Sequence, residues 1–176
     1  MVRRRVLTWG GFLALLMATS VVHAQAPAGA EYVLRVEGAV LTPLAFTRQQ
    51  IEALPWREYT ESREVQQDGR VVKLSVRYQG YPLRDLIDQA GLAPERRAVR
   101  HTAVLLTARD GYRVVFSWGE IYNSALGDGV IVVRSQDGRD ILAADGLLAL
   151  RSLQDTRSGP RHVRWLERLE LRVLGD

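Results

Sequence analysis

Short runs of alternating apolar residues, separated by Asp-Gly pairs, are the feature that most restricts how this chain can fold. In the clearest run, Val72, Leu74, Val76 and Tyr78 occupy every second position. This period of two predicts a strand with one buried face. Asp-Gly pairs begin at residues 68, 110, 128, 137 and 145, and each predicts a turn because glycine reaches positive φ at little cost. A fold rich in short strands follows.

The other predicted elements are short strands and shorter helices. Further strands are expected over residues 31–40, 101–107, 112–116, 130–133, 147–151 and 169–173. One helix is expected to begin at Thr47, which forms a capping-box pattern with Gln50, and to end at Leu54. A second is expected over residues 81–91, with Pro82 in its first turn and Gly91 at its C-terminal cap, and a third over residues 118–123. Strands outnumber helices, so the predicted class is α+β, with mixed sheets and short helices.

The N-terminus has the organisation of an export signal. Three arginines at positions 3–5 precede an apolar run from Val6 to Met17, and small residues follow at Ala24 and Ala26. This run is shorter than the roughly 20 apolar residues that a bilayer span requires. The sequence therefore predicts a signal peptide over residues 1–26, cleaved after Ala24 or Ala26. The mature protein is expected to be periplasmic, without a membrane span.

Charge and length limit what the mature chain can do. The three arginines of the predicted signal account for three of the formal charges, so the net charge falls from +4 to +1. A nearly neutral domain has little long-range attraction for phosphate backbones, and nucleic acid is not an expected partner. Residues 27–176 are enough for one core and are predicted to form a single domain.

Cysteine is absent, and histidine is scarce. The lack of cysteine excludes disulfides, thiolate metal sites and cysteine nucleophiles. Beyond the predicted signal only His101 and His162 remain, so a three-histidine zinc site is impossible. His101 begins an apolar run and is expected to be a hydrogen-bonded histidine of the core.

The segment from Arg157 to Trp165 concentrates cationic side chains beside a Gly-Pro turn. One guanidinium group can donate two parallel hydrogen bonds to two oxygens of a phosphate or sulfate group. Arg161 and Arg164, with His162 between them, are therefore candidates for an anion site. Alternatively, this segment is a solvated edge in which Arg161 and Arg164 pair with nearby carboxylates, Asp155, Glu167 or Glu170, and Trp165 fills the core. The sequence leaves both interpretations open.

Two further groups of polar residues give weaker signals. Arg109 and Tyr112 flank the Asp110-Gly111 pair and form a second, weaker candidate site, whose alternative is a hairpin turn with a surface Arg–Asp pair. The carboxylates at positions 58, 61 and 64 are spaced too closely on an extended segment to resemble a catalytic pair. They are expected to form a solvated face.

Four segments, in this order, resemble the small sulfite-oxidase-like domains of the oxidoreductase molybdopterin-binding family. They are the LRVEGAV run at 34–40 with its following Leu-Pro helix, YQGYPLRDLI at 78–87, ARDGY at 108–112, and GPRHVRWL at 159–166. The resemblance implies a sulfite-oxidase-type α+β fold. In active relatives a molybdenum–pterin cofactor carries out redox chemistry and passes electrons to a haem partner. The last segment there helps to hold the pterin phosphate, which would place Arg161, His162 and Arg164 at the anion end of the pocket.

The chain departs from this family at the metal ligand. Active relatives bind molybdenum through a cysteine before the Gly-x-Pro-Leu signature, and the corresponding stretch here, Thr60 to Gly69, contains none. We therefore expect an exported module that binds a small anion, a pterin or a partner without the family's redox catalysis. One alternative is a molybdopterin-dependent oxidoreductase whose metal lacks a cysteine ligand. Another is an accessory or sensor protein for a membrane partner.

Overall fold

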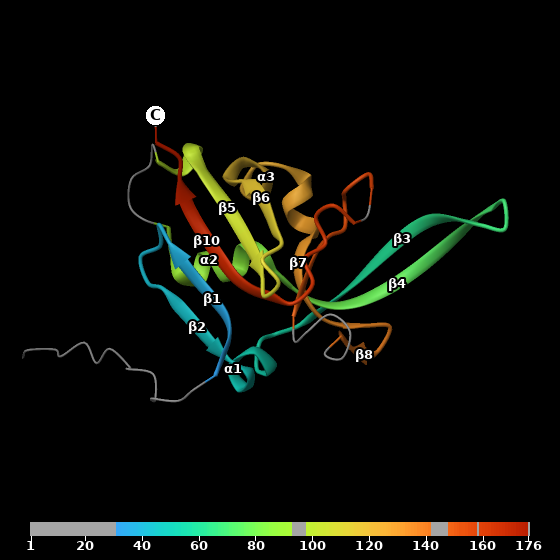
Figure 1. Cartoon of the computed structure of the whole chain (residues 1–176), viewed down its shortest axis with the longest axis horizontal. Helices are drawn as coiled ribbons and strands as arrows, with labels where there is room; N and C mark the ends of the chain where they lie inside the picture. The colour runs from blue at the N-terminus through green and yellow to red at the C-terminus, as the bar shows by residue number, and fades with distance from the viewer. Residues whose placement is uncertain (1–30, 93–97, 142–147, 158, 176) are drawn as a thin grey trace, which may run out of the picture. The chain divides into compact units, whose positions relative to one another are not determined.

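The strands predicted from alternation are present and form two sheets (Figure 1). The computed structural model describes residues 31–92, 98–141, 148–157 and 159–175. The described elements lie in Glu31–Asp176, which forms one compact unit. The predicted signal peptide and the Asp-Gly pair at 145 lie outside the described residues.

The first sheet has the strand order β2-β1-β10-β5-β6. Its members are β1 (Tyr32–Gly38), β2 (Leu44–Thr47), β5 (Thr102–Ala108), β6 (Arg113–Ser117) and β10 (Leu166–Val173). β1 pairs with β10 in parallel, whereas the other pairs in this sheet are antiparallel. The first and last strands of the described chain therefore lie together at the centre of one sheet.

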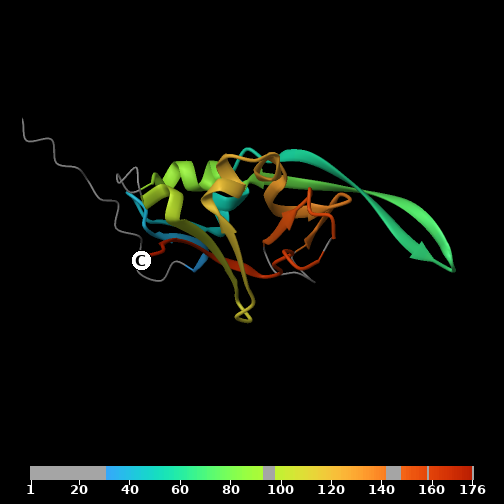
Figure 2. The same ribbon diagram turned by 90° about the horizontal axis from the view of Figure 1, so that it is seen from above.

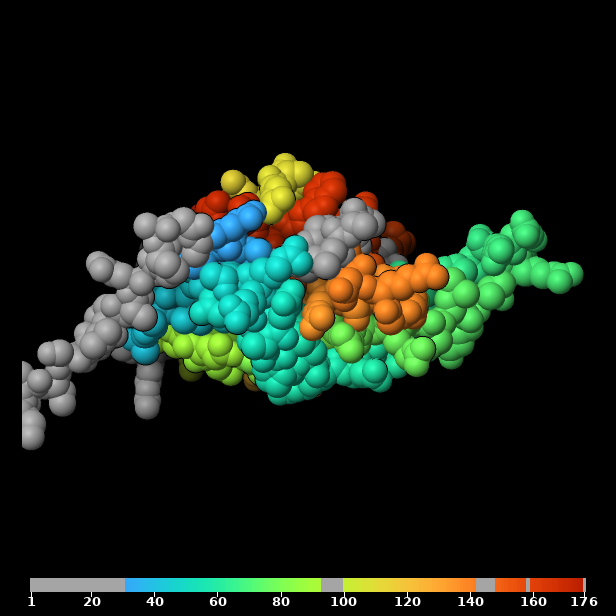
Figure 3. Space-filling view, turned by 90° about the horizontal axis from the view of Figure 1, so that it is seen from below, coloured from blue at the N-terminus to red at the C-terminus, as the bar shows by residue number. Residues whose placement is uncertain are grey.

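The second sheet has the order β3-β4-β7-β8, and β9 also pairs with β7. Its members are β3 (Arg57–Gln67), β4 (Arg70–Pro82), β7 (Val130–Gln136), β8 (Arg139–Asp140) and β9 (Ala149–Ser152). β3 and β4 are the longest strands and pair along their whole common length as a hairpin. Only the base of this hairpin joins β7, so its distal part extends beyond the neighbouring elements (Figures 1 and 3).

Three short helices cover one face of the first sheet (Figure 2). They are α1 (Arg48–Glu52), α2 (Leu83–Ala90) and α3 (Trp118–Tyr122). The capping box of Thr47 and Gln50 is confirmed, and Ser117 and Glu120 form a second one at α3. Gly91 caps α2 with a φ of 67°. Pro82 was predicted inside the first turn but lies one residue earlier, at the N-cap with extended backbone. No described helix is long and apolar enough to span a membrane.

The Asp-Gly turns follow the prediction at three hairpins and differ at one other described site. In the turn between β5 and β6, Gly111 of the pair at 110–111 has a φ of 88°. Asp68 and Gly69, like the pair at 137–138, both have positive φ and close two-residue turns. The pair at 128–129 instead lies within a 3₁₀ helix, η2 (Ala125–Gly129), and Gly129 does not have positive φ. There glycine avoids a clash, because a Cβ on Gly129 would lie 2.9 Å from the Gln154 side chain.

The main core lies between the helices and the first sheet. Leu83, Leu86 and Ile87 bury the inner face of α2 against Leu34, Val36 and other strand residues. A smaller cluster under the second sheet joins Tyr78 to Ile131 and Val133. Each fully buried side chain of this size contributes about 1.5–3 kcal/mol by removal from water.

Two predictions about single residues are wrong. His101 is exposed rather than part of the core, because it ends a 3₁₀ turn, η1 (Ala98–His101), just before β5 enters the sheet. Glu61 is only 9% exposed and does not belong to a solvated face. It occupies the inward side of β3, where Arg63 and the Tyr78 hydroxyl hydrogen-bond to its carboxylate.

Candidate anion-binding site

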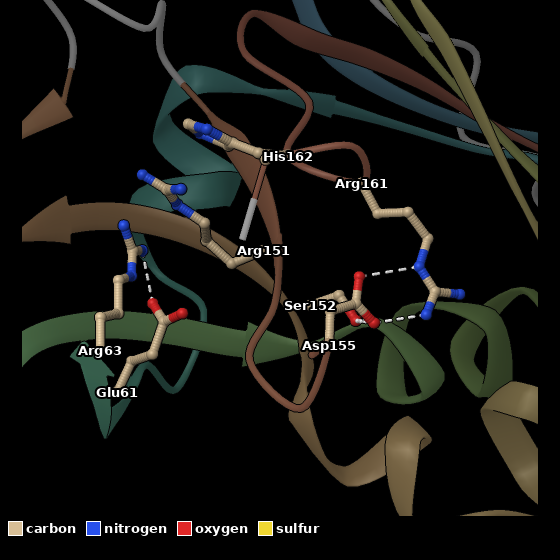
Figure 4. A pocket seen from close by; sticks show the side chains of 8 residues that line it. Glu61, Arg63, Arg151, Ser152, Asp155, Arg161 and His162 are labelled. Atoms are coloured by element: carbon tan, nitrogen blue, oxygen red, sulfur yellow. Dashed lines mark hydrogen bonds and ion pairs between the residues drawn. The ribbon is translucent and has the colours of Figure 1, made fainter. Parts of the chain in front are cut away.

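Side chains from three separate segments converge on one small cavity (Figure 4). β3 contributes Glu61 and Arg63, β9 contributes Arg151 and Ser152, and the loop that follows contributes Asp155, Gly159, Arg161 and His162. Figure 4 shows the Arg63, Arg151 and His162 side chains on one side of the pocket and the Arg161–Asp155 pair on the other. Three arginines and two carboxylates line the cavity, and a third carboxylate, Glu120, pairs with Arg161 from outside it.

A hydrogen-bonded triad supports the β3 side of the pocket. The Nη2 of Arg63 donates to the Glu61 carboxylate and to the Tyr78 hydroxyl, each at 2.5 Å. The Tyr78 hydroxyl in turn donates to Glu61 at 3.1 Å. Burial raises the pKa of Tyr78 to about 12. The hydrogen bond that Arg63 donates to Glu61 raises the pKa of Arg63, so the triad holds a neutral tyrosine and a cationic arginine.

Arg161 is fixed by two carboxylates and a ring. Its Nε donates to Asp155 at 2.8 Å, its Nη2 donates to the same carboxylate, and its Nη1 donates to Glu120 at 2.8 Å. The guanidinium lies 4.5 Å from the centre of the Phe116 ring. Burial opposes ionisation of Glu120, but hydrogen bonds from the Ser117 N–H and from Arg161 outweigh it, so the pKa of Glu120 lies below its ordinary value. These contacts attach the loop to the start of α3.

The structure brings the two candidate segments together. The Tyr112 hydroxyl donates to the Pro160 carbonyl at 2.6 Å, and the Arg109 N–H donates to the Trp165 carbonyl at 2.9 Å. Asp110 accepts from the Tyr112 N–H within the predicted hairpin turn. The β5–β6 turn therefore supports the loop that carries Arg161 and His162.

Arg164 lies apart from the other two candidates in its segment. It is exposed, its guanidinium lies 5.6 Å from the centre of the Trp165 ring, and it does not line the cavity. Trp165 is 38% exposed and has a φ of 51°, which is rare for a bulky residue. Arg161 and His162 thus face the cavity, whereas Arg164 lies on the surface.

Six of the eight pocket residues, among them Glu61, Arg63 and Arg151, were not among the sequence candidates. Glu61 and Arg63 share one face of β3 because they are two residues apart. Their partner Tyr78 lies at the apolar end of the alternating run in β4, directly opposite Tyr59 in the hairpin register. The spacing of Glu61 and Arg63 was therefore available in the sequence, but the inward direction of their face was not.

The space available differs sharply between two adjoining regions. The cavity between Arg63, Arg151, Arg161 and His162 has a volume of about 10 Å³, room for roughly one water molecule. Next to it, a groove of about 490 Å³ runs between β3 and the segment from Leu153 to Arg157. Ligand sites commonly measure about 300–1,000 Å³. A small ligand would fit the groove and direct an anionic group towards the arginines.

Comparison with known proteins identifies the family. The sequence profile described as the oxidoreductase molybdopterin binding domain matches residues 21–173. The chain belongs to this family. The match covers all four segments that carry the resemblance, and it fits the mixed sheets and short helices of the molybdopterin-binding domain fold.

A solved structure supports the same fold. The sulfane dehydrogenase SoxCD from Paracoccus pantotrophus matches with a TM-score of 0.62 and 18% sequence identity. The match covers 81% of this chain but only 38% of the SoxCD chain, so this member of the molybdopterin-binding family spans well under half of that protein. No curated protein matches the chain.

The cysteine ligand that the family resemblance implies is absent from this member. The sequence contains no cysteine, and no three His, Asp or Glu side chains among the described residues form a group that could hold a metal. Thiolates are the soft ligands that suit such a metal, and carboxylates replace them poorly. The side chains present fit an anion better than molybdenum.

Proposed function

We propose that this protein is an exported binding module for a small ligand bearing a phosphate or sulfate group, a pterin phosphate included. It does not carry out the redox catalysis of its family. The observation that carries the proposal is the convergence of Arg63, Arg151 and Arg161 with His162 on one cavity beside a ligand-sized groove. Export to the periplasm and a partner in that compartment are parts of this proposal.

Arg63 gives the strongest support. Its Nε–H is buried and has no acceptor among the described residues. A buried donor without a partner costs about 1–3 kcal/mol, and more when it is charged. An oxygen of a phosphate or sulfate group would satisfy this donor while the Nη2 remains bound to Glu61 and Tyr78. Ligand binding therefore need not break the triad.

The donor set argues against a molybdenum centre. Within Thr60 to Gly69, where the family resemblance implies the metal ligand, the carboxylate that lines the pocket is Glu61, and it is hydrogen-bonded to Arg63 and Tyr78. A cation placed there would compete with the arginine charge. We derive no reaction step through a metal.

Titration calorimetry and thermal unfolding test the proposal with inorganic phosphate, sulfate and a pterin monophosphate as probes. At 100 times its Kd, a bound ligand adds about 2.7 kcal/mol, which raises the Tm by roughly 5–11 °C. We expect R63M to abolish this stabilisation and R164M, outside the cavity, to retain it. If none of the probes binds the wild-type protein, or if R63M binds them equally well, the anion site is wrong.

Elemental analysis for molybdenum, on protein purified from its own host, tests the proposal that the family's redox catalysis is absent. Native mass spectrometry should give the mass of the cleaved chain without molybdenum. Stoichiometric molybdenum with a pterin mass would overturn the proposal and favour a redox enzyme whose metal has no cysteine ligand.

A further inference from the structure

The outer edge of β3 is a long unpaired strand edge within the described structure. β3 pairs with β4 on one side, and none of the described strands pairs with it on the other. Proteins usually protect such edges by keeping them short or covering them, because their free N–H and C=O groups can pair with another chain. This edge is 11 residues long and exposed at Glu58, Thr60, Ser62 and Glu64.

The hairpin turn determines which backbone groups face outwards. Gln67 and Arg70 close a two-residue turn and form a hydrogen-bonded pair of the kind that ends such hairpins. Because hydrogen-bonded and non-hydrogen-bonded pairs alternate, the odd-numbered residues of β3 direct their N–H and C=O groups towards β4. The even-numbered residues, from Glu58 to Gln66, direct theirs towards the free edge.

The charges along β3 complement one another in one antiparallel register of two identical strands. When Ser62 faces Ser62 across a two-fold axis, Glu61 lies opposite Arg63 and Tyr59 lies opposite Val65. Each of these pairs shares a face, since all four residues are odd-numbered. Moving the centre by one residue in either direction places Glu61 opposite Glu61 or Arg63 opposite Arg63. Like charges directly opposed are destabilising, so of these three registers only the one centred on Ser62 is favourable.

We propose that two copies of this chain associate through their β3 edges, antiparallel and centred on Ser62, to form a continuous four-stranded sheet. The interface is isologous, as in most two-fold dimers. Each Glu61 would then lie between Arg63 of its own strand and Arg63 of the second copy.

A single introduced cysteine tests the register, because the natural chain has no thiol. In the proposed dimer the two Ser62 Cα atoms are about 5.5 Å apart, within the range that a disulfide spans. Under mild oxidation, S62C should form a covalent dimer at low protein concentration. Q66C, equally exposed, should not crosslink with itself but should crosslink with E58C in a mixture, since these residues face each other across the axis. If S62C crosslinks no faster than Q66C alone, the register is wrong.

Substitutions at Thr60 separate association from hairpin stability. In the dimer Thr60 faces Glu64 of the second copy, whereas within the hairpin it faces Arg77. T60K should therefore tighten the dimer and T60E should weaken it, each by about 2- to 30-fold, because every dimer contains two such pairs. Their effects on hairpin stability should have the opposite sign. Sedimentation equilibrium measures the dissociation constant, and thermal unfolding of dilute monomer measures stability.

Two outcomes overturn the proposal. The wild-type protein could remain monomeric at every concentration that can be reached. Alternatively, T60K and T60E could change dimerisation in the same direction as monomer stability. Binding of phosphate or sulfate by a protein that stays monomeric would reject the dimer but leave the proposed anion site intact.

Discussion

Removal of the Arg161 guanidinium should show how much the ion pairs of the pocket contribute to the free energy of unfolding. In R161M, the Asp155 side chain, only 11% exposed, loses both hydrogen bonds from Arg161, while the one from Ser152 remains. Removing one partner of a buried ion pair costs about 3–5 kcal/mol, and the contact with the 41% exposed Glu120 adds at most about 1 kcal/mol. Because Arg161 itself is 26% exposed, we expect a loss of about 2–4 kcal/mol.

Urea unfolding at pH 7 measures this loss, and thermal unfolding should show a Tm lower by roughly 4–16 °C. R164M is the control: it removes an exposed guanidinium stacked on Trp165 and should cost at most about 1 kcal/mol. In the double variant R161M/D155N the losses should not add, since the carboxylate left unpaired by R161M is gone. A loss below about 1 kcal/mol for R161M, or additive losses in the double variant, would refute this account.

Three shorter predictions concern backbone space and titration. G127A should lose several kcal/mol in urea unfolding, because a Cβ there would lie 2.0 Å from the Ile121 carbonyl oxygen, whereas G119A, with its nearest atom at 3.9 Å, should be neutral or stabilising. The pKa of Tyr78 is raised to about 12 in the fold, which favours the neutral hydroxyl there. The free energy of unfolding should therefore fall as the pH rises from about 10 to 12. Urea unfolding over this pH range should show a smaller fall for Y78F. The pKa of Glu120 is lower in the folded protein than in the unfolded chain, so its ionised form stabilises the fold at pH values above about 4.5. This contribution is lost as the pH falls, so E120Q should lose less stability than wild type when urea unfolding is measured at pH values below about 4.5.

Local sequence patterns predicted the strands and helices well, because these elements depend mainly on residues close together in the sequence. The alternation from Val72 to Tyr78 became part of β4, and the Thr47 capping box begins α1 where it was expected. Pairing between distant strands was beyond such patterns. Nothing local indicates that β1 joins β10 in parallel or that β2 pairs with β1. These contacts depend on the burial of both sheets against the helices.

The candidate site was predicted only in part, because a sequence with charged residues on both faces of a strand does not show which face is buried. Arg161 and His162 do line a cavity, but Glu61 was assigned to solvent on the assumption that charged residues face outwards. This assumption fails where opposite charges satisfy each other, as Glu61 and Arg63 do beneath Tyr78. The same rule fails in the other direction along β4, where Leu74 was predicted on the buried face but is 44% exposed because it lies in the distal part of the hairpin.

The loss of cysteine and the Glu61–Arg63 pair are connected through the same stretch of chain. The stretch that corresponds to the family's metal ligand, Thr60 to Gly69, forms most of β3 and contributes both residues to the pocket. A thiolate there would add an unpaired negative charge suited to a metal. Glu61 instead has its charge balanced by Arg63, so its carboxylate is not available to coordinate a metal. The Arg63 Nε–H has no acceptor among the described residues. On the proposed function, this arrangement offers an unsatisfied cationic donor to an anion in place of a ligand to a metal.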